Sequence, residues 1–109
     1  MDTKDRLYEA HAEICKALSH PKRLEILDIL RSGESAVETI AQKTGMQKSN
    51  LSQHLSVLRK ARLVTTRRQG LNIFYTLANP AILDACDILR KVLLDSWAES
   101  GSIVSAILE

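Results

Sequence analysis

The spacing of apolar residues changes twice along this 109-residue chain, and these changes constrain its fold more than any other feature. Up to Ala61, apolar residues recur every three or four positions, as they do on one face of an α-helix. Residues 63–68 and 73–77 then form two short runs rich in Val, Thr, Ile, Phe and Tyr, which is typical of β-strands. The helical spacing returns after Asn79-Pro80. The chain is therefore predicted to form four helices, a hairpin and a fifth helix.

The third and fourth predicted helices are short and follow each other closely. Ser35 and Glu38 are three positions apart, which is the pattern of a capping box and predicts the start of the third helix. Gly45 is expected to end that helix, because glycine readily adopts the left-handed conformation that often follows a helix. The fourth helix is predicted over residues 48–61.

Ala41, Gly45 and Leu51 have the spacing of a helix-turn-helix. The small Ala41 lets two helices cross closely, Gly45 forms the turn, and Leu51 anchors the second helix to the first. The outer face of that second helix is rich in polar side chains that can hydrogen-bond to base edges, although an ordinary solvated surface is the alternative. The candidate DNA-binding residues here are Gln47, Lys48, Ser49, Asn50, Ser52, Gln53 and His54.

A basic segment coincides with this motif. Residues 39–83 contain seven Lys or Arg and none of the 13 acidic residues, although the whole chain has a net charge of only +2. Such an acid-free segment favours binding to a polyanion, most often nucleic acid, and an unpartnered basic face is the alternative. The chain has few aromatic residues for stacking on single-stranded bases, so double-stranded DNA is the predicted partner.

The predicted hairpin adds a second group of candidate DNA contacts. Gly70 is suited to the positive φ of a tight turn. Arg67, Arg68 and Gln69 lie directly before it, where a β-wing beside a recognition helix contacts phosphates or the adjacent minor groove. The alternative is a hairpin tip that only increases solubility.

Three segments together resemble the ArsR/SmtB family of winged-helix repressors: His-Pro-Lys-Arg-Leu-Glu-Ile-Leu at 20–27, Leu-Ser-Gln-His-Leu-Ser-Val-Leu-Arg at 51–59 and Phe-Tyr-Thr-Leu at 74–77. The resemblance covers nearly the whole chain. It implies a mainly α winged helix-turn-helix with a small β-hairpin, and a homodimer formed through the first and last helices. It also implies operator binding by the helix at 48–61 and the wing at 67–72, with release by an effector.

Two features bear on how closely the chain follows this family. The length of 109 residues predicts one domain, over 1–109. The family usually has glycine directly after the recognition helix, where this chain has Arg62. Arg62 is therefore expected to adopt the turn conformation at some cost, or the helix runs longer, and the side chain could add a phosphate contact.

The residues that bind effectors in metal-sensing relatives are missing here. One class of relatives has Cys-Val-Cys in the third helix, where this chain has Ala-Val-Glu at 36–38, and no histidine follows His54 for the other class. We therefore expect neither a metal site nor a cofactor. Cys15 and Cys86 fall on the first and last helices, where they could sense oxidants, sulfur species or metalloids, or could simply be small core residues.

Enzymes, membrane proteins and secreted proteins are not expected, because the sequence lacks their characteristic motifs. It contains no P-loop, Cys/His pair or paired-acid motif, so an enzyme is not expected. No apolar run approaches the length of a membrane span and no secretory signal is present, which favours a cytoplasmic protein. Two functions stay open: a dimeric operator-binding repressor, and a winged-helix module that binds only other proteins. The position of the basic segment favours the repressor.

Overall fold

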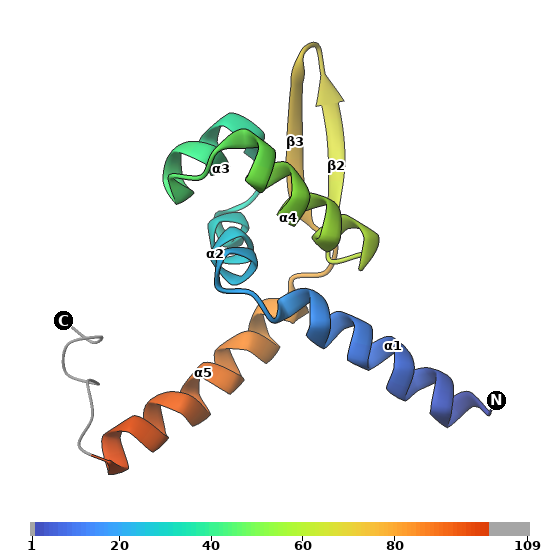
Figure 1. The fold of residues 1–109 in the computed structure, drawn as a ribbon, viewed down its shortest axis with the longest axis vertical. Helices are drawn as coiled ribbons and strands as arrows, with labels where there is room; N and C mark the ends of the chain where they lie inside the picture. The colour runs from blue at the N-terminus through green and yellow to red at the C-terminus, as the bar shows by residue number, and fades with distance from the viewer. Residues whose placement is uncertain (1, 101–109) are drawn as a thin grey trace. The chain divides into compact units, whose positions relative to one another are not determined.

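The computed structural model describes residues 2–100, in which the predicted helices and hairpin occur in the predicted order, with a short 3-10 helix and a two-residue strand in addition (Figure 1). In chain order they are α1 (Thr3–Leu18), α2 (Pro21–Ile29), a short 3-10 helix η1 (Leu30–Ser32), β1 (Ser35–Ala36), α3 (Val37–Thr44), α4 (Lys48–Lys60), β2 (Val64–Gln69), β3 (Asn72–Leu77) and α5 (Ala81–Glu99). The chain divides into two compact units, Met1–Asn79 and Pro80–Glu109. The first unit therefore contains the helix-turn-helix and the hairpin, and the second contains α5.

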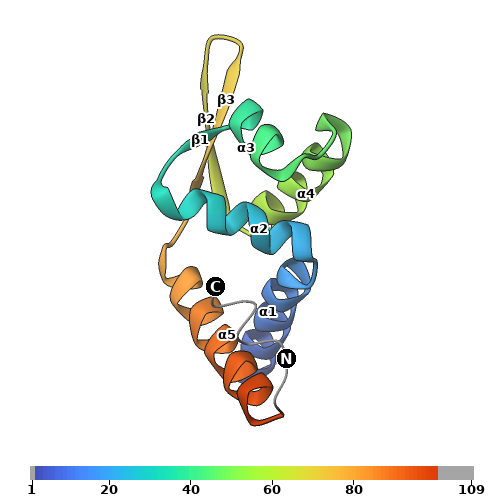
Figure 2. The same ribbon diagram turned by 90° about the vertical axis from the view of Figure 1, so that its left-hand side faces the viewer.

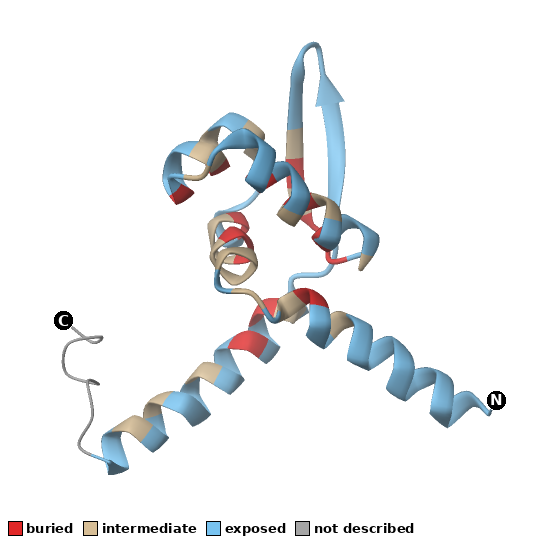
Figure 3. Ribbon diagram, in the orientation of Figure 1, coloured by how far each residue is buried: buried red, intermediate tan, exposed pale blue. Residues whose placement is uncertain are grey.

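The core of the first unit is built from aliphatic side chains of α2, α3 and α4 together with the start of β2 (Figure 3). Full burial of each such side chain contributes roughly 1.5–3 kcal/mol of transfer free energy. Three leucines of α4, Leu51 among them, face inward, which agrees with the anchoring role predicted for Leu51. The largest fully buried side chains are Ile26, Leu27, Leu30, Ile40, Leu51, Leu55, Leu58 and Val64.

The hairpin belongs to a three-stranded antiparallel sheet in the order β1-β3-β2. Gly70 has φ 62° at the tip, so the predicted turn residue is confirmed. Beyond Val64 every residue of β2 is exposed, and Figure 2 shows the β2–β3 hairpin extending well past the helices that pack at its base. The distal half of the hairpin is therefore a projecting wing.

The capping box predicted at Ser35 and Glu38 is wrong. Ser35 lies in β1, opposite Tyr75 of β3, and α3 begins two residues later with Ala36 as its N-cap and no side-chain cap. Ser35 pairs with β3 and therefore cannot serve as the N-cap of α3. The Glu38 carboxylate pairs instead with Lys48 at the start of α4. A tertiary contact has thus replaced a local one.

Arg62 adopts the left-handed turn conformation expected of it, with φ 62°. The N–H groups of Arg62 and Leu63 donate to the carbonyls of Arg59 and Leu58, which closes the C-terminus of α4 in a Schellman-type arrangement. A residue with a Cβ in this conformation costs roughly 1–2 kcal/mol relative to glycine. The chain therefore carries local strain directly after α4.

Replacing Arg62 with glycine should stabilise the protein by about 1 kcal/mol, because it relieves the backbone strain at this position. The gain is smaller than the strain itself, because glycine also gives the unfolded chain more conformational freedom. Urea unfolding at fixed protein concentration measures the change. Arg59→Gly is the matched control, since it removes the same side chain from helical backbone and should destabilise by about 0.5–1 kcal/mol. A lower stability for Arg62→Gly would show that the Arg62 side chain outweighs the strain.

The unit that contains α5 leaves much apolar surface uncovered in the single chain. Leu83 and Cys86 are buried, but Ile88, Leu89 and Val92 are 66%, 70% and 61% exposed. The first helix shows the same feature, because Leu7 and Tyr8 are also mostly exposed. No described helix is long and apolar enough to cross a membrane. Apolar patches of this kind mark interaction surfaces.

Candidate nucleic-acid interface

The turn between α3 and α4 is fixed by several hydrogen bonds. Gly45 has φ 69°, and its N–H donates to the carbonyl of Ala41 over 2.9 Å. The Thr44 hydroxyl donates to the carbonyl of Ile40, and the Lys22 ammonium from α2 donates to the carbonyl of Thr44 over 3.2 Å. A cation at the C-terminus of α3 is favourable for the helix dipole. These contacts hold α4 at a defined angle to α3.

The predicted DNA-reading side chains form the outward face of α4. Leu51, Leu55 and Leu58 face inward, so the residues between them point away from the core. His54 differs from the rest because it is half-buried. The exposed candidates are Gln47, Lys48, Ser49, Asn50, Ser52 and Gln53.

The N-terminus of α4 has the properties of an anion site. Gln47 is its N-cap, its side chain makes no cap hydrogen bond, and the first turn contains no acid. The first N–H groups of a helix lack partners within the helix, and the positive end of the dipole favours a phosphate there. Lys48 adds positive charge, although its ion pair with Glu38 offsets part of it.

His54 faces α2, where it contacts a second histidine and an arginine. The Arg23 guanidinium donates to Nδ1 of His54 over 3.3 Å, and the rings of His20 and His54 lie 4.3 Å apart. Partial burial, together with repulsion from His20 and Arg23, lowers the pKa of His54. An arginine cannot accept a hydrogen bond, so Nδ1 is the acceptor and His54 is neutral here. His54 thus connects α4 to α2.

Arg23 also ties α4 to the end of α1. Its Nε donates to the carbonyl of Ala17 over 2.6 Å, and a terminal nitrogen donates to the carbonyl of Lys16 over 3.3 Å. Both carbonyls belong to the last turn of α1, where a guanidinium can serve as a donor, and the carbonyl of Lys16 also accepts from the N–H and hydroxyl of Ser19. One side chain therefore connects α1, α2 and α4. The sequence alone did not indicate this role, because Arg23 lies in a His-Pro-Lys-Arg segment that resembles the family without assigning a function to the arginine.

The two wing arginines differ in their surroundings. Arg67 forms a two-point ion pair with Glu34, with distances of 3.0 Å and 2.7 Å, and its guanidinium lies 4.7 Å from the ring centre of Phe74. The hydrogen bond from Arg67 lowers the pKa of Glu34. Arg68 is exposed and, as the next residue of the strand, points to the opposite face. The Glu34–Arg67 pair joins residues 33 positions apart, so local sequence patterns gave no sign of it.

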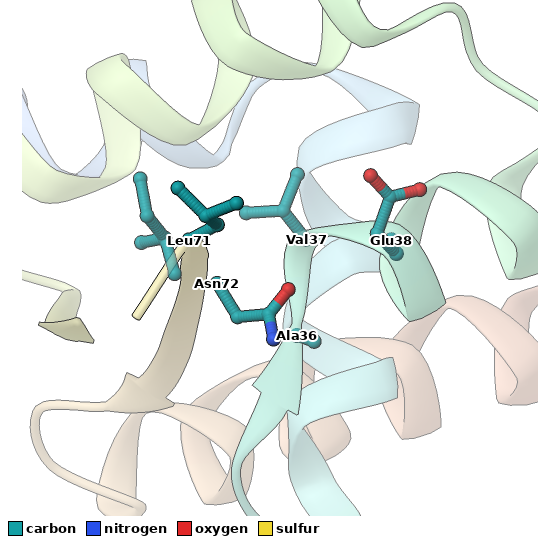
Figure 4. Close-up of a pocket in the computed structure, with 6 residues that line it drawn as sticks. Ala36, Val37, Glu38, Leu71 and Asn72 are labelled. Atoms are coloured by element: carbon teal, nitrogen blue, oxygen red, sulfur yellow. The ribbon is translucent and has the colours of Figure 1, made fainter. Parts of the chain in front are cut away.

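Residues at and next to the tip of the wing meet the start of α3 at a small pocket of about 160 Å³ (Figure 4). Val37 and Glu38 line it from α3, and Leu71 and Asn72 line it from the wing. Sites for small molecules usually have volumes of roughly 300–1,000 Å³, so this pocket is below that range. Leu71 is 96% exposed at the tip of the wing. The tip therefore presents an apolar side chain next to Gln69 and Arg68.

The two predicted effector residues differ in their exposure. Cys15 on α1 is exposed, whereas Cys86 on α5 is buried. They belong to different units, and the thiol sensor stays a prediction. Within residues 2–100, no cluster of three or more His, Cys, Asp or Glu side chains has a geometry that could hold a metal ion.

Comparison with known proteins identifies the family. Residues 20–66 match the family described as "Bacterial regulatory protein, arsR family". The transcriptional regulator Rv0081 of Mycobacterium tuberculosis is 42% identical over 88 residues, which are 80% of this chain and 77% of that protein. Its crystal structure superposes with a TM-score of 0.79 at 37% identity, covering 88% of this chain and 97% of that one.

Two further relatives bear on assembly and regulation. A homodimeric winged helix-turn-helix DNA-binding domain from Mycobacterium bovis, Mb0332, is 36% identical with a TM-score of 0.76, covering 85% of this chain and 86% of that one. The transcriptional repressor SdpR of Bacillus subtilis is 33% identical over 72 residues, which are 66% of this chain and 80% of that protein. These relatives are transcriptional regulators rather than enzymes. The chain belongs to the ArsR family of bacterial transcriptional regulators and has the winged helix-turn-helix fold of that family.

Proposed function

We propose that the protein is a homodimeric repressor that binds an inverted-repeat operator through α4 and the wing. The main supporting observation is the outward face of α4, where polar side chains surround a helix N-terminus whose first turn contains no acidic residue and whose N-cap makes no side-chain hydrogen bond. This face lies inside the acid-free segment 39–83. Polar side chains can read base edges in the major groove while the helix N-terminus and Lys48 bind phosphate. Operator binding requires access to the chromosome, so we expect a cytoplasmic protein.

The two wing arginines have different roles in this proposal. Arg68 and Gln69 are exposed near the tip, where a wing contacts phosphates or the adjacent minor groove. Arg67 is held by Glu34 and Phe74, so its main role is to fix the orientation of the wing. Loss of the Glu34 carboxylate would release Arg67 without removing any positive charge.

The homodimer is proposed from exposed apolar surface together with the homodimeric state of the Mycobacterium bovis domain. The helix α5 exposes Ile88, Leu89 and Val92, and α1 exposes Leu7 and Tyr8. Pairing two chains through these helices would cover surface that a monomer rarely leaves open to water. A two-fold axis then requires a symmetric operator whose half-sites lie one DNA turn, or a multiple of it, apart.

Gln53→Ala and Arg68→Ala should affect operator binding in different ways. Gln53→Ala should cost about 1–3 kcal/mol on the operator and little on unrelated DNA, because a base contact is lost. Arg68→Ala should weaken binding to both DNAs and reduce the slope of log K against log salt by about one unit, because a phosphate contact is lost. Fluorescence anisotropy over a salt series measures both effects. Equal loss of specificity in the two variants would contradict these roles, and binding without salt dependence would favour a protein-binding module.

A further inference from the structure

We propose that the first unit contains a binding site for a small organic carboxylate in a pocket between α1, α2 and α4. The pocket, called here the α1–α4 pocket, has a volume of about 430 Å³. This volume lies within the range of small-molecule sites, roughly 300–1,000 Å³. All of its lining residues belong to Met1–Asn79, so the site does not depend on the position of α5.

The chemistry of the pocket favours an anion with an apolar body. Lys16 from α1, Arg23 from α2 and Lys60 from α4 supply three positive charges, whereas Glu13 supplies one negative charge. Val57 of α4 and Ala61, which caps its C-terminus, add apolar surface. Ammonium and guanidinium groups bind carboxylates through charge-assisted hydrogen bonds, and neighbouring apolar atoms suit a hydrocarbon group. A carboxylate attached to a compact apolar group matches both features.

Arg23 has remaining capacity to bind such a carboxylate. Its three contacts go to the carbonyl oxygens of Lys16 and Ala17 and to Nδ1 of His54. A guanidinium has five N–H donors, so these contacts leave two for a ligand. Because Arg23 is half-buried, its attraction for an anion is less screened by water than that of an exposed side chain.

A ligand in this pocket would also act on the proposed DNA-binding surface, and this part of the inference rests on the proposed function. Lys60 and Val57 belong to α4, the recognition helix, and Arg23 is the side chain that connects α1 to His54. A bound carboxylate would neutralise charge on α4 and would share the guanidinium that His54 contacts. Coupling between two sites typically changes affinity about 5–150-fold, so we expect a fall of that size in operator affinity.

The binding test uses the full chain without DNA. Benzoate, phenylacetate and hexanoate are titrated and followed by NMR, with benzamide and inorganic phosphate as controls that lack the charge or the apolar body. At least one of the three carboxylates should shift the amide signals around Lys16 and Val57 saturably and bind at least tenfold more tightly than either control. If none of the three binds, or if phosphate binds equally well, the proposed site is wrong.

Two variants of Val57 test whether the ligand binds in the α1–α4 pocket. Val57 is 38% exposed, so both Val57→Asn and Val57→Asp should stay folded, which circular dichroism checks. The two side chains have nearly the same shape, but only aspartate brings a negative charge beside the ligand. We expect Val57→Asp to bind the carboxylate about tenfold or more weakly than Val57→Asn. Equal affinities in two folded variants would overturn the assignment to this pocket.

Operator binding with and without the carboxylate separates the two proposals. Failure to bind the operator in the absence of carboxylate would overturn the proposed function and leave the ligand site standing on the NMR result. Operator binding that does not change at saturating carboxylate would overturn the coupling. A fall in operator affinity that is lost in Val57→Asp and kept in Val57→Asn supports the complete inference.

Discussion

Leu89→Asp is expected to convert the protein to a monomer and abolish operator binding. Leu89 is 70% exposed in the single chain, so the aspartate is well solvated there and the fold should be kept. In the proposed dimer the same carboxylate would be buried without a partner, which costs several kcal/mol in each subunit. Sedimentation velocity measures the mass, circular dichroism the helix content, and anisotropy the operator affinity.

Ala98→Asp is the matched control for this change. It introduces the same charge on α5, but on the polar side of the helix. Ala98 comes three residues after Asp95 and seven after Lys91, so the three side chains lie on the same side of α5. This variant should remain a dimer with nearly unchanged operator affinity. A Leu89→Asp protein that sediments as a dimer would mean that the interface does not include this part of α5.

Leu55→Ala is expected to lower the free energy of unfolding by about 2–5 kcal/mol, because it leaves a cavity in the core behind α4. Leu55 is 2% exposed. The effect is a large part of the roughly 5–15 kcal/mol that stabilises a typical domain. Urea unfolding at a fixed protein concentration measures it, since the stability of a dimer depends on concentration.

Val57→Ala provides the comparison within the same helix. Val57 is 38% exposed, so its replacement by alanine removes less buried apolar surface than the replacement of Leu55 does. Alanine also has a higher helix propensity than valine, which offsets part of the loss. Its effect on the free energy of unfolding should be well below that of Leu55→Ala. A loss of less than 1 kcal/mol for Leu55→Ala would show that the core behind α4 can close around the missing atoms.

The fold was largely predictable because its main signals are local. The spacing of Leu51, Leu55 and Leu58 shows which side of α4 is buried, and Gly45 and Gly70 are at turns that need a positive φ. The short strand β1 was not predictable from such signals. It has two residues, and it exists because Ser35 and Ala36 pair with β3 about 40 positions later in the chain.

The candidate site was predictable only in part, for the same physical reason. Helical spacing identified the exposed polar residues of α4, but it did not indicate that His54 would turn toward Arg23. The basic composition of the wing suggested equal roles for Arg67 and Arg68. The structure separates them, because Glu34 approaches one arginine and not the other in the described residues. Long-range pairs of this kind leave no local pattern.

Selection from a pool of random duplex DNA tests the central proposal most directly. The full chain is incubated with the pool at fixed salt, and the bound DNA is sequenced after several rounds. We expect a two-fold symmetric site whose half-sites lie about one turn apart, and Gln53→Ala should relax the base preference within each half-site. Recovery of no enriched sequence, or of a site without two-fold symmetry, would contradict a dimer that reads an operator through α4.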